Sequence, residues 1–342
     1  MINLNSIQEK ILKGDNLSIR ESEFLFEKIF DGTLNKEKIS SILTILSFRG
    51  ESYEEIYGAV KVLEKKSKKI NLNGKLLDTC GTGGDNKKSF NFSTASAILA
   101  TACGLKVAKH GNRSVTSKSG SIDILEALGI KICDTNKEVR SMFDKCNICF
   151  LFAPVFHKSL AKVSMIRKNL NFRTIFNLLG PLLNPAKINY QLLGVTEKKF
   201  LKTHSSCLSK MNLEESWVVH NLDGYDELTT TSTNLIVKVK KKKVFKVTKI
   251  NPSDIGFKTS KQSDLLGGDS KENAFIMHRL FEGETGPIRD NVILNTSACL
   301  LMSGKVKSLE EGMKLAGTTI DNFKAKKKLE ELTSIFNNDE CS

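Results

Sequence analysis

Three glycines, an acid and several hydroxyl residues lie together in the segment DTCGTGGDNKKSFNFSTAS, which begins at Asp78. Glycines let backbone amides approach an anion closely, and the amino end of a helix adds the positive end of its dipole. Ser93 or Thr94 is expected to cap the helix that follows, with hydroxyls left for a phosphate or a metal ion. The segment predicts a phosphate-binding turn, although an ordinary tight turn would also explain it if it stood alone.

A second turn of the same type follows the next apolar run. LKVA leads directly into KHGNRSVTSKSGS, where Lys109, Asn112 and Arg113 crowd the turn before another helix. A solvated charged loop explains Lys118 well, but it explains poorly why Lys109 and His110 directly follow an apolar run. Two neighbouring strand-to-helix turns of this type reinforce each other as the binding site of one polyphosphate group.

Two adjacent carboxylates, Asp226 and Glu227, follow the apolar run SWVVHN. Neighbouring carboxylates in a turn can both reach hydrated Mg²⁺, which prefers oxygen ligands and keeps several of its waters. An Asp-Glu pair is also common in plain polar loops. The pair is a candidate magnesium site if its loop faces the two turns.

The first 70 residues are expected to form helices that support these segments. Ser18 with Glu21, and Ser52 with Glu55, have the spacing of capping boxes, in which each side chain satisfies the other residue's backbone amide. Apolar residues recur at helical spacing in the same region. A small helical bundle follows from this pattern.

Beyond Asn73 the pattern changes to short apolar runs separated by turns and helical stretches. The runs are KLLDTC, LKVAKHG, KICD, NICFLFAP, YQLLGV and SWVVHN. Strands that alternate with helices imply a mostly parallel sheet covered by helices on both faces, and ligands bind at the carboxyl ends of such strands. LIVKVKKKKVFKVTKI predicts an exposed antiparallel hairpin with a lysine-rich tip. The chain from Glu272 to Phe336 again has a helical pattern.

Composition limits the class of protein. No stretch approaches the roughly 18 to 20 consecutive apolar residues of a membrane span, and the amino-terminal segment lacks the features of a signal peptide. The eight cysteines are scattered, most of them in apolar runs, as is typical of free thiols in a reducing compartment, so a cytoplasmic location is expected. Lysine and arginine exceed aspartate and glutamate by 52 to 38, a net charge of +14, which would attract a polyphosphate or a nucleic acid alike.

Several motifs together resemble one family. DTCGTGGD, NFST, KHGNR and SGSIDILEALG are similar to the signature of anthranilate phosphoribosyltransferases, and FLFAPVFHKSL, RTIFNLLGPLLNPA and VVHNLDGYDEL extend the resemblance to about Asn295. The resemblance implies transfer of the phosphoribosyl group of phosphoribosyl pyrophosphate to the amine of anthranilate, with Mg²⁺. It also implies an α/β fold with a small helical domain (1–70, completed by helices within 155–190), a larger catalytic domain with a mostly parallel central sheet flanked by helices (71–342), and a homodimer formed through the helical domain.

The resemblance also assigns roles to individual positions. Lys109 and Arg167 would be catalytic, and anthranilate would contact Gly81, Asn112 and Arg167. The Mg²⁺ ligands would be Ser93, Asp226 and Glu227. Phosphoribosyl pyrophosphate would be bound by both turns, at Gly81, Gly84, Asp85, Ser89, Asn91, Phe92, Ser93, Thr94, Lys109, His110, Gly111, Asn112, Arg113, Ser114, Val115, Thr116, Ser117 and Ser121.

Arg167 and the basic charge leave other interpretations open. Arg167 alone could be a surface residue of its helix, although its planar fork suits the carboxylate of an aromatic acid. A nucleic-acid-binding relative of the same fold would fit the charge, and its mark would be salt-sensitive DNA binding without turnover. A pyrimidine nucleoside phosphorylase also acts at a ribose anomeric carbon. The two turns, Arg167 and the acid pair together favour the transferase, with no membrane or nucleic-acid partner expected.

Overall fold

The computed structural model describes residues 2–114 and 119–336, which form two compact units. The first unit contains the chain up to Lys69 together with Pro154–Pro185. The second contains Ile70–Ala153 together with the chain from Ala186 onward. Within the described ranges, no helix combines the length and the apolar character needed to cross a membrane.

The first unit is helical, as the capping signals predict. Its helices are α1 (Leu4–Leu12), α2 (Ile19–Asp31), α3 (Lys36–Arg49), α4 (Tyr53–Lys66), α9 (Ala161–Leu170) and α10 (Ile175–Leu179), with short 3₁₀ turns at Lys158–Leu160 and Gly180–Leu182. The capping boxes of Ser18 with Glu21 and of Ser52 with Glu55 are both formed, which confirms those predictions. Phe176 of α10 packs edge-on against Phe26 and Phe30 of α2, so the later segment completes the core of the first.

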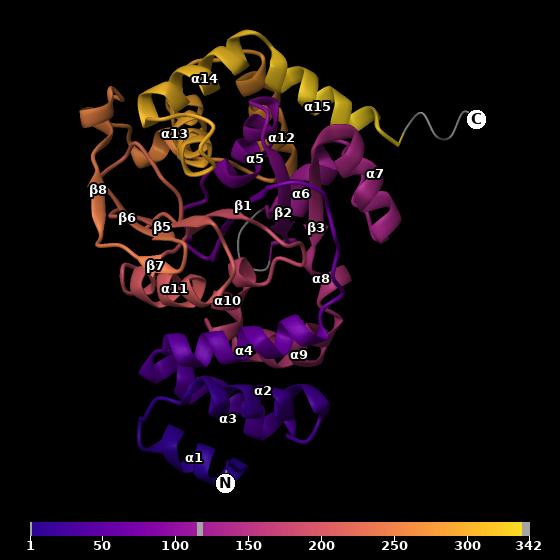
Figure 1. Cartoon of the computed structure of the whole chain (residues 1–342), viewed down its shortest axis with the longest axis vertical. Coiled ribbons are helices and arrows are strands. Elements are labelled where there is room, and N and C mark those ends of the chain that lie inside the picture. Colours follow the sequence, from indigo (N-terminus) through magenta and orange to yellow (C-terminus); the bar gives the residue numbers. More distant parts are fainter. Residues whose placement is uncertain (1, 115–118, 337–342) are drawn as a thin grey trace. The chain divides into compact units, whose positions relative to one another are not determined.

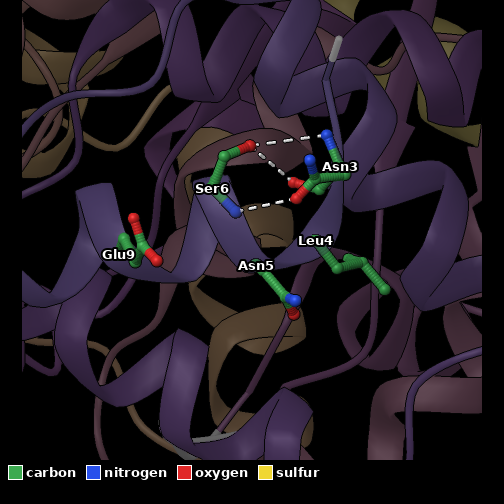
Figure 2. A pocket seen from close by; sticks show the side chains of 5 residues that line it. All are labelled: Asn3, Leu4, Asn5, Ser6 and Glu9. Carbon is green, nitrogen blue, oxygen red and sulfur yellow. Dashed lines mark hydrogen bonds between the residues drawn. The ribbon is translucent and has the colours of Figure 1, made fainter.

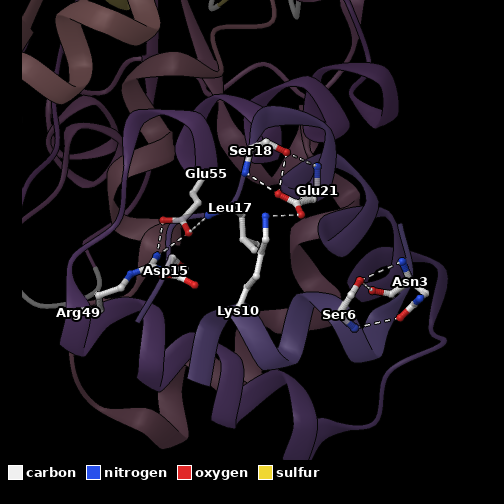
Figure 3. A network of polar contacts seen from close by, with 9 residues as sticks. All are labelled: Asn3, Ser6, Lys10, Asp15, Leu17, Ser18, Glu21, Arg49 and Glu55. Carbon is white, nitrogen blue, oxygen red and sulfur yellow. Dashed lines mark hydrogen bonds and ion pairs between the residues drawn. The ribbon is translucent and has the colours of Figure 1, made fainter. Parts of the chain in front are cut away.

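A buried carboxylate ties the helices of this unit together (Figure 3). Glu55 accepts hydrogen bonds from the backbone N–H groups of Leu17 (3.0 Å) and Ser52 (2.8 Å), and it pairs with the Arg49 guanidinium. Burial of an unpaired carboxylate would be costly, so these partners are required for the side chain to lie inside. The network fixes the turn before α2 against the start of α4.

The second unit contains an eight-stranded sheet in the order β3-β2-β1-β4-β5-β6-β7, with β8 also paired to β6 (Figure 1). The parallel strands are β1 (Leu76–Gly81), β2 (Lys106–Gly111), β3 (Ile148–Phe152), β4 (Tyr190–Gly194) and β5 (Glu215–Asn221). The antiparallel strands are β6 (Asn234–Lys240), β7 (Lys243–Val244) and β8 (Thr248–Ile250). The lysine-rich segment is thus an antiparallel hairpin at the edge of the sheet, as predicted.

Helices cover both faces of this sheet, which confirms the expected α/β fold. Figure 1 shows α11 on one side of the sheet and α5, α13 and α14 on the other. The helices of the unit are α5 (Phe92–Ala102), α6 (Ser121–Ala127), α7 (Asn136–Cys146), α11 (Lys199–Lys210), α12 (Ser270–Phe281), α13 (Pro287–Met302), α14 (Leu309–Asp321) and α15 (Lys324–Ser334), with 3₁₀ turns at Pro252–Ile255 and Gln262–Leu265. The short α8 (Ala153–Phe156) lies where the chain passes from one unit to the other.

The order of the strands reverses between β1 and β4. From β1 the chain runs outward through β2 and β3, whereas from β4 it runs in the opposite direction through β5. In open parallel sheets such a switch point opens a crevice beyond the carboxyl ends of the two central strands, where ligands bind. The segments that follow Gly81 and Gly194 therefore border the expected ligand-binding crevice.

One predicted strand is wrong. Residues 131–134, the KICD run, form neither strand nor helix and lead from α6 to α7. The position beside β2 is taken instead by β3, whose residues Ile148–Phe152 follow α7. An apolar run with no neighbouring strand to pair with has no partner for its backbone groups, so it cannot form a strand.

Candidate functional site

The ends of β1 and β4 are shaped by two glycines that make room for Asp226. Gly81 and Gly194 pair at the end of their strands. A Cβ at Gly81 would lie 2.2 Å from Asp226 Oδ2, and a Cβ at Gly194 would lie 1.4 Å from the Asp226 carbonyl oxygen. Only glycine fits at position 194, where the clash is with backbone, whereas a Cβ at position 81 would displace the Asp226 carboxylate. The acid pair therefore lies directly over the switch point of the sheet.

The glycine-rich loop after β1 folds around the same carboxylate. The Gly83 backbone N–H donates to Asp226 Oδ2 at 2.7 Å, and the Thr82 N–H donates to the Gly194 carbonyl at 2.9 Å. Gly83 and Gly84 have φ values of 67° and 79°, in the region that glycine adopts without strain. The loop thus brings backbone amides to the acid pair, and Gly84 remains exposed.

The start of α5 differs from the prediction that Ser93 or Thr94 would cap it. Asn91 is the N-cap, and its Oδ1 accepts the Thr94 backbone N–H at 3.0 Å and the Ser93 hydroxyl at 3.3 Å. The prediction was wrong because the helix begins at Phe92, upstream of both candidates. The Ser93 N–H is then free to donate to Glu227 Oε1 at 3.2 Å. The positive end of α5 therefore faces an acidic side chain.

Lys109 is buried at the centre of the site. The residue is only 2% exposed. Its ammonium group donates to the Thr79 carbonyl and to Ser93 Oγ, the latter at 3.1 Å. Thr79 is on β1 and Lys109 is on β2, so this side chain links two neighbouring strands to the start of α5. The positive charge lowers the pKa of both Asp226 and Glu227, against the larger effect of their burial.

Three carboxyls share this region, and the pKa of each is raised. Burial, and then the neighbouring Asp226 charge, raises the pKa of Asp85 to about 7. Burial raises the pKa of Asp226 as well, and burial with the charges of Asp226 and Asp85 raises the pKa of Glu227 well above its usual value. A divalent cation would relieve both causes, because it replaces lost solvation and screens the repulsion.

The oxygen atoms near the acid pair have the chemistry that Mg²⁺ prefers, namely two carboxylates and the Ser93 hydroxyl. Among residues 2–114 and 119–336, no three His, Cys, Asp or Glu side chains are grouped so that they could hold a metal ion by themselves. Mg²⁺ is commonly bound by one or two carboxylates together with substrate phosphates and water. The donor set therefore fits a Mg²⁺ ion that arrives with a phosphorylated ligand.

The second turn, after β2, is closed by one acid. Asp123 Oδ2 accepts the backbone N–H groups of Ser114 (2.9 Å) and Gly120 (2.8 Å), and the Ser121 hydroxyl donates to the Asn112 carbonyl at 3.2 Å. A Cβ at Gly111 would lie 2.3 Å from Ser121 Oγ, so a larger residue there would displace this hydroxyl. Val115, Thr116 and Ser117, which were expected to bind phosphate, lie outside the described residues.

Three other residues that were predicted to bind phosphoribosyl pyrophosphate, two after β2 and one at the start of α5, already have partners in the protein. The backbone N–H of the buried His110 donates to Asp78 Oδ1 at 3.1 Å. Arg113 pairs with Glu126 at 2.6 Å and lies over the Phe152 ring, with its side chain about half exposed. Phe92 is fully buried and packs edge-on against Phe90, so its side chain belongs to the core.

A segment that the sequence analysis missed holds the far end of the glycine-rich loop. Phe90 N–H donates to the Leu265 carbonyl and Gly267 N–H donates to the Lys88 carbonyl, both at 2.9 Å, with Ser89 paired to Leu266 between them. A Cβ at Gly267 would lie 2.9 Å from Phe90 Cα. The glycines of LLGGD were the available signal, because glycine within an extended pattern often marks a close approach of two backbones.

A small cavity at the switch point brings most of these elements together. Its lining includes both residues of the acid pair and Asn295 of α13, to which the resemblance assigns no role. The lining residues are Thr79, Cys80, Gly81, Ser93, Ser96, Leu192, Gly194, Val219, Asp226, Glu227 and Asn295. By contrast, the surface hollow at the start of α1 (Figure 2) is lined by Asn3 and Ser6, whose polar atoms form a capping box.

Arg167 is on α9 and belongs to the first unit, whereas Gly81 and Asn112 belong to the second. Its guanidinium lies over the Phe176 ring, 5.7 Å from the ring centroid, and burial lowers its pKa from the usual value. The aromatic face holds the planar cation in place without using its N–H groups. A guanidinium held by a ring face can still use its N–H donors to bind an anion.

Comparison with known proteins gives a consistent result over nearly the whole chain. A model of the glycosyl transferase family, a/b domain, matches residues 73–326, and a model of the helical bundle domain of the glycosyl transferase family matches residues 5–67. Anthranilate phosphoribosyltransferase of Petrotoga mobilis is 43% identical over 334 residues, which cover 97% of each chain.

Solved structures agree with the sequence relatives. The crystal structure of anthranilate phosphoribosyltransferase from Thermus thermophilus superposes with a TM-score of 0.89 at 34% identity, covering 97% of this chain and 99% of the other. The Saccharomyces cerevisiae enzyme in complex with phosphoribosyl pyrophosphate and Mg superposes with a TM-score of 0.88 at 28% identity, covering 98% and 99%. The chain belongs to the anthranilate phosphoribosyltransferase family.

Proposed function

We propose that this protein transfers the phosphoribosyl group of 5-phosphoribosyl 1-pyrophosphate to the amine of anthranilate, a step of tryptophan biosynthesis that releases pyrophosphate. The observation that carries this proposal is the meeting of two strand-to-helix turns, a buried lysine and an acid pair at one switch point. Backbone amides and a lysine suit a polyphosphate anion, and the acid pair suits its metal ion. The family membership supplies the identity of the two substrates.

The two turns would bind phosphoribosyl pyrophosphate. Gly84, Asp85 and Ser89 belong to the first turn, and Asn112 and Ser121 belong to the second. Asn91 and Thr94 would act by fixing the start of α5, since the cap hydrogen bond between them sets the helix terminus. Lys109, at the end of β2, would favour departure of the negative leaving group through its positive charge.

Mg²⁺ would be held by Asp226, Glu227 and Ser93 together with the pyrophosphate. When bound, it would neutralise charge that develops on the leaving group. This proposal is supported by the buried, mutually repelling carboxyls described above, for which a cation is the natural counter-charge. The larger unit, from residue 71 onward, would then be the catalytic domain.

Anthranilate would be bound through Arg167, with Gly81 and Asn112 as further contacts. A guanidinium can pair with the anthranilate carboxylate in bidentate fashion, and a lysine at this position could not. Displacement at the anomeric carbon should pass through an oxocarbenium-like state, as in glycosyl transfer generally. The aromatic amine is neutral at pH 7, so positioning and electrostatics would provide the rate acceleration rather than a general base.

The direct test follows the fluorescence of anthranilate as it is consumed with phosphoribosyl pyrophosphate and Mg²⁺. Arg167→Ala should raise KM for anthranilate about 10-fold or more, because a charge-assisted bidentate contact is lost. Asp226→Asn should lower Mg²⁺-dependent turnover by about 100-fold, because the metal loses a charged ligand. Both effects are expected at saturating concentrations of the unaffected substrate.

Two controls match these variants. Arg20→Ala removes an exposed arginine of α2 in the same unit as Arg167, and Asp223→Asn alters an acid in the same loop as Asp226. Neither should change turnover by more than about twofold. Absence of turnover in the unmodified protein would reject the function, and normal kinetics in both Arg167→Ala and Asp226→Asn would reject the site assignment.

We also infer a homodimer formed through the helical unit. Three large apolar side chains on neighbouring helices of this unit are exposed: Leu12 of α1 (72%), Phe48 of α3 (94%) and Met165 of α9 (60%). Exposed apolar residues on adjacent elements are typical of a protein-protein interface.

The cytoplasmic location expected from the sequence is supported by the described cysteines, which carry free thiols.

A further inference from the structure

The loop 222–233, which carries the acid pair, is held by two asparagines of α13. The loop joins β5 to β6 and lies over the ends of β1 and β4. We propose that Asn291 and Asn295 are positioning residues that hold Asp226 and Glu227 in place for a metal ion bound with the substrate. This inference rests on the proposed function, and it assigns a role to a helix that contributes no ligand.

Asn295 is hydrogen-bonded to the backbone of Leu228, the residue that follows the acid pair. Its Oδ1 accepts the Leu228 backbone N–H at 3.1 Å, and its Nδ2 donates to the Leu228 carbonyl at 2.7 Å. The same Nδ2 donates to the Asn291 carbonyl at 2.8 Å, and the residue is only 3% exposed. Both backbone groups of Leu228 are therefore fixed by one side chain, and the backbone next to Glu227 cannot rotate freely.

Asn291 repeats the contact two residues further along the loop. Its Oδ1 accepts the Thr230 backbone N–H at 2.8 Å, and its Nδ2 donates to Thr230 Oγ1 at 2.9 Å and to the Pro287 carbonyl at 2.6 Å. Asn291 is fully buried. The backbones of Leu228 and Thr230 are thus both anchored to the same helix.

The spacing of the two asparagines on α13 lets their side chains hold two nearby residues of the loop. Residues four apart in a helix lie on one face and are separated by about 6 Å along its axis. Leu228 and Thr230 are separated by one residue in the loop, and each is hydrogen-bonded to one of the two asparagines. A pair of asparagines at this spacing can therefore hold Leu228 and Thr230 at the same time, which a single asparagine could not do.

The acid pair needs such a restraint because its members repel each other. Asp226 and Glu227 are adjacent in sequence and line the same small cavity as Asn295. A loop free to relax would move these carboxylates apart and toward water, since burial of charge is unfavourable. The clamp formed by Asn291 and Asn295 would keep both carboxylates directed at the site before the metal arrives, which is the usual contribution of residues behind metal ligands.

The test measures metal binding and not only catalysis. Mn²⁺ is titrated by calorimetry into the full chain saturated with phosphoribosyl pyrophosphate. Asn295→Ala should raise the Kd for Mn²⁺ about 10-fold or more, as is common for residues that orient metal ligands. Asn295→Asp keeps the shape and the acceptor but removes both donated hydrogen bonds, and it should weaken Mn²⁺ binding similarly. KM for anthranilate should stay within about twofold in these variants, since no anthranilate contact is changed.

Asn251→Ala is the matched control. Asn251 accepts the Thr233 hydroxyl at 2.6 Å, so it holds the same loop at the end remote in sequence from the acid pair. Its Kd for Mn²⁺ should equal that of the unmodified protein. If Asn295→Ala does not fold, Asn291→Ser and Asn295→Asp decide the question by the same titration.

Two negative outcomes are distinguishable. If the unmodified protein binds no Mn²⁺ in the presence of phosphoribosyl pyrophosphate, the proposed metal site fails. If the unmodified protein binds Mn²⁺ and the folded Asn291 and Asn295 variants bind it equally well, the metal site stands and the positioning role is overturned. A loss of thermal stability without a change in Mn²⁺ affinity would likewise overturn it, because it would show a purely structural role.

Discussion

Lys109 and the carboxyls around the switch point place opposite charges where water has little access. A buried ammonium is unfavourable unless it is hydrogen-bonded and paired, and Lys109 has two oxygen partners within the site. Its neighbours Asp226 and Glu227 are stabilised in their charged form by the same ammonium group. The Lys109 ammonium therefore offsets part of the effect of burial, which raises the pKa of both carboxyls.

His157 gives a residue-level prediction about pH. Its Nε2 donates to the Leu183 carbonyl at 2.8 Å, and burial lowers its pKa to about 4 from 6.5. Between these two values the unfolded chain binds more protons than the folded one, so stability falls as the pH is lowered and is unaffected above this window. The free energy of unfolding should lose about 2 kcal/mol from this group between pH 7 and pH 5. Urea unfolding followed by circular dichroism at the two pH values measures the loss.

The variant His157→Gln isolates this contribution. It removes the titration but keeps a donor, so its stability should change about 2 kcal/mol less over the same pH interval. His278→Gln is the control, because His278 is exposed on α12. An equal pH dependence in the unmodified protein and in His157→Gln would show that His157 does not take up a proton on unfolding.

At the residue level, the sequence identified groups whose chemistry is local but not those that depend on a distant partner. Lys109 could be chosen because a charged residue that directly follows an apolar run is unusual, and Asp226 because it forms an acid pair with Glu227 in the loop after a strand. The role of Gly194 could not be found, because the reason for glycine is the Asp226 carbonyl, which is brought there by a different strand. Asn291 and Asn295 did leave a signal, namely two amides at helical spacing in α13, both of them buried.

At the scale of elements, strand-helix alternation predicted the sheet because periodicity and turn chemistry are local properties. The strand predicted at the KICD run does not form, because the position beside β2 is occupied by β3. The start of α5 was misplaced by two residues because Asn91, Ser93 and Thr94 are all good caps. Which of these residues caps the helix depends on where the helix begins, and the sequence alone does not fix that position.

The pairing of the 265–267 segment with the glycine-rich loop leads to an element-level prediction. In Gly267→Ala, the new Cβ would lie 2.9 Å from Phe90 Cα and 2.4 Å from Asn273 Oδ1. The backbone contact cannot be relieved by a side-chain rotation, so the segment 88–90 should shift. KM for phosphoribosyl pyrophosphate should rise about 10-fold, since small displacements of a binding loop are costly. Steady-state kinetics with varied phosphoribosyl pyrophosphate measures this effect.

Gly317→Ala provides the comparison for this variant. Gly317 lies on α14, and its added Cβ would have its nearest contacts at 3.8 Å, an ordinary packing distance. Its KM values should match those of the unmodified protein. An unchanged KM for phosphoribosyl pyrophosphate in Gly267→Ala would show that the 265–267 segment does not control the glycine-rich loop.

At the scale of the molecule, the helical unit combines the amino-terminal chain with Pro154–Pro185, a segment that interrupts the α/β unit in sequence. The motif resemblance led to the expectation of such an arrangement, because hydrophobic periodicity alone does not say which helices pack together. Aromatic side chains join the two segments, since Phe26 and Phe30 of the first segment form one cluster with Phe176 of the second. The extent of the catalytic domain and the oligomeric state stay predictions.

The proposed dimer can be tested at its most exposed apolar residue. Phe48 is 94% exposed on α3, and burial of such a side chain in an interface would contribute about 2 kcal/mol per subunit. Phe48→Lys should therefore shift the protein from dimer to monomer in sedimentation equilibrium at micromolar concentration, because a buried unpaired charge opposes association. Phe275→Lys is the control, since Phe275 is 61% exposed on α12 of the other unit and should leave the dimer intact. A dimer of equal strength in Phe48→Lys, or dissociation in Phe275→Lys instead, would place the interface elsewhere.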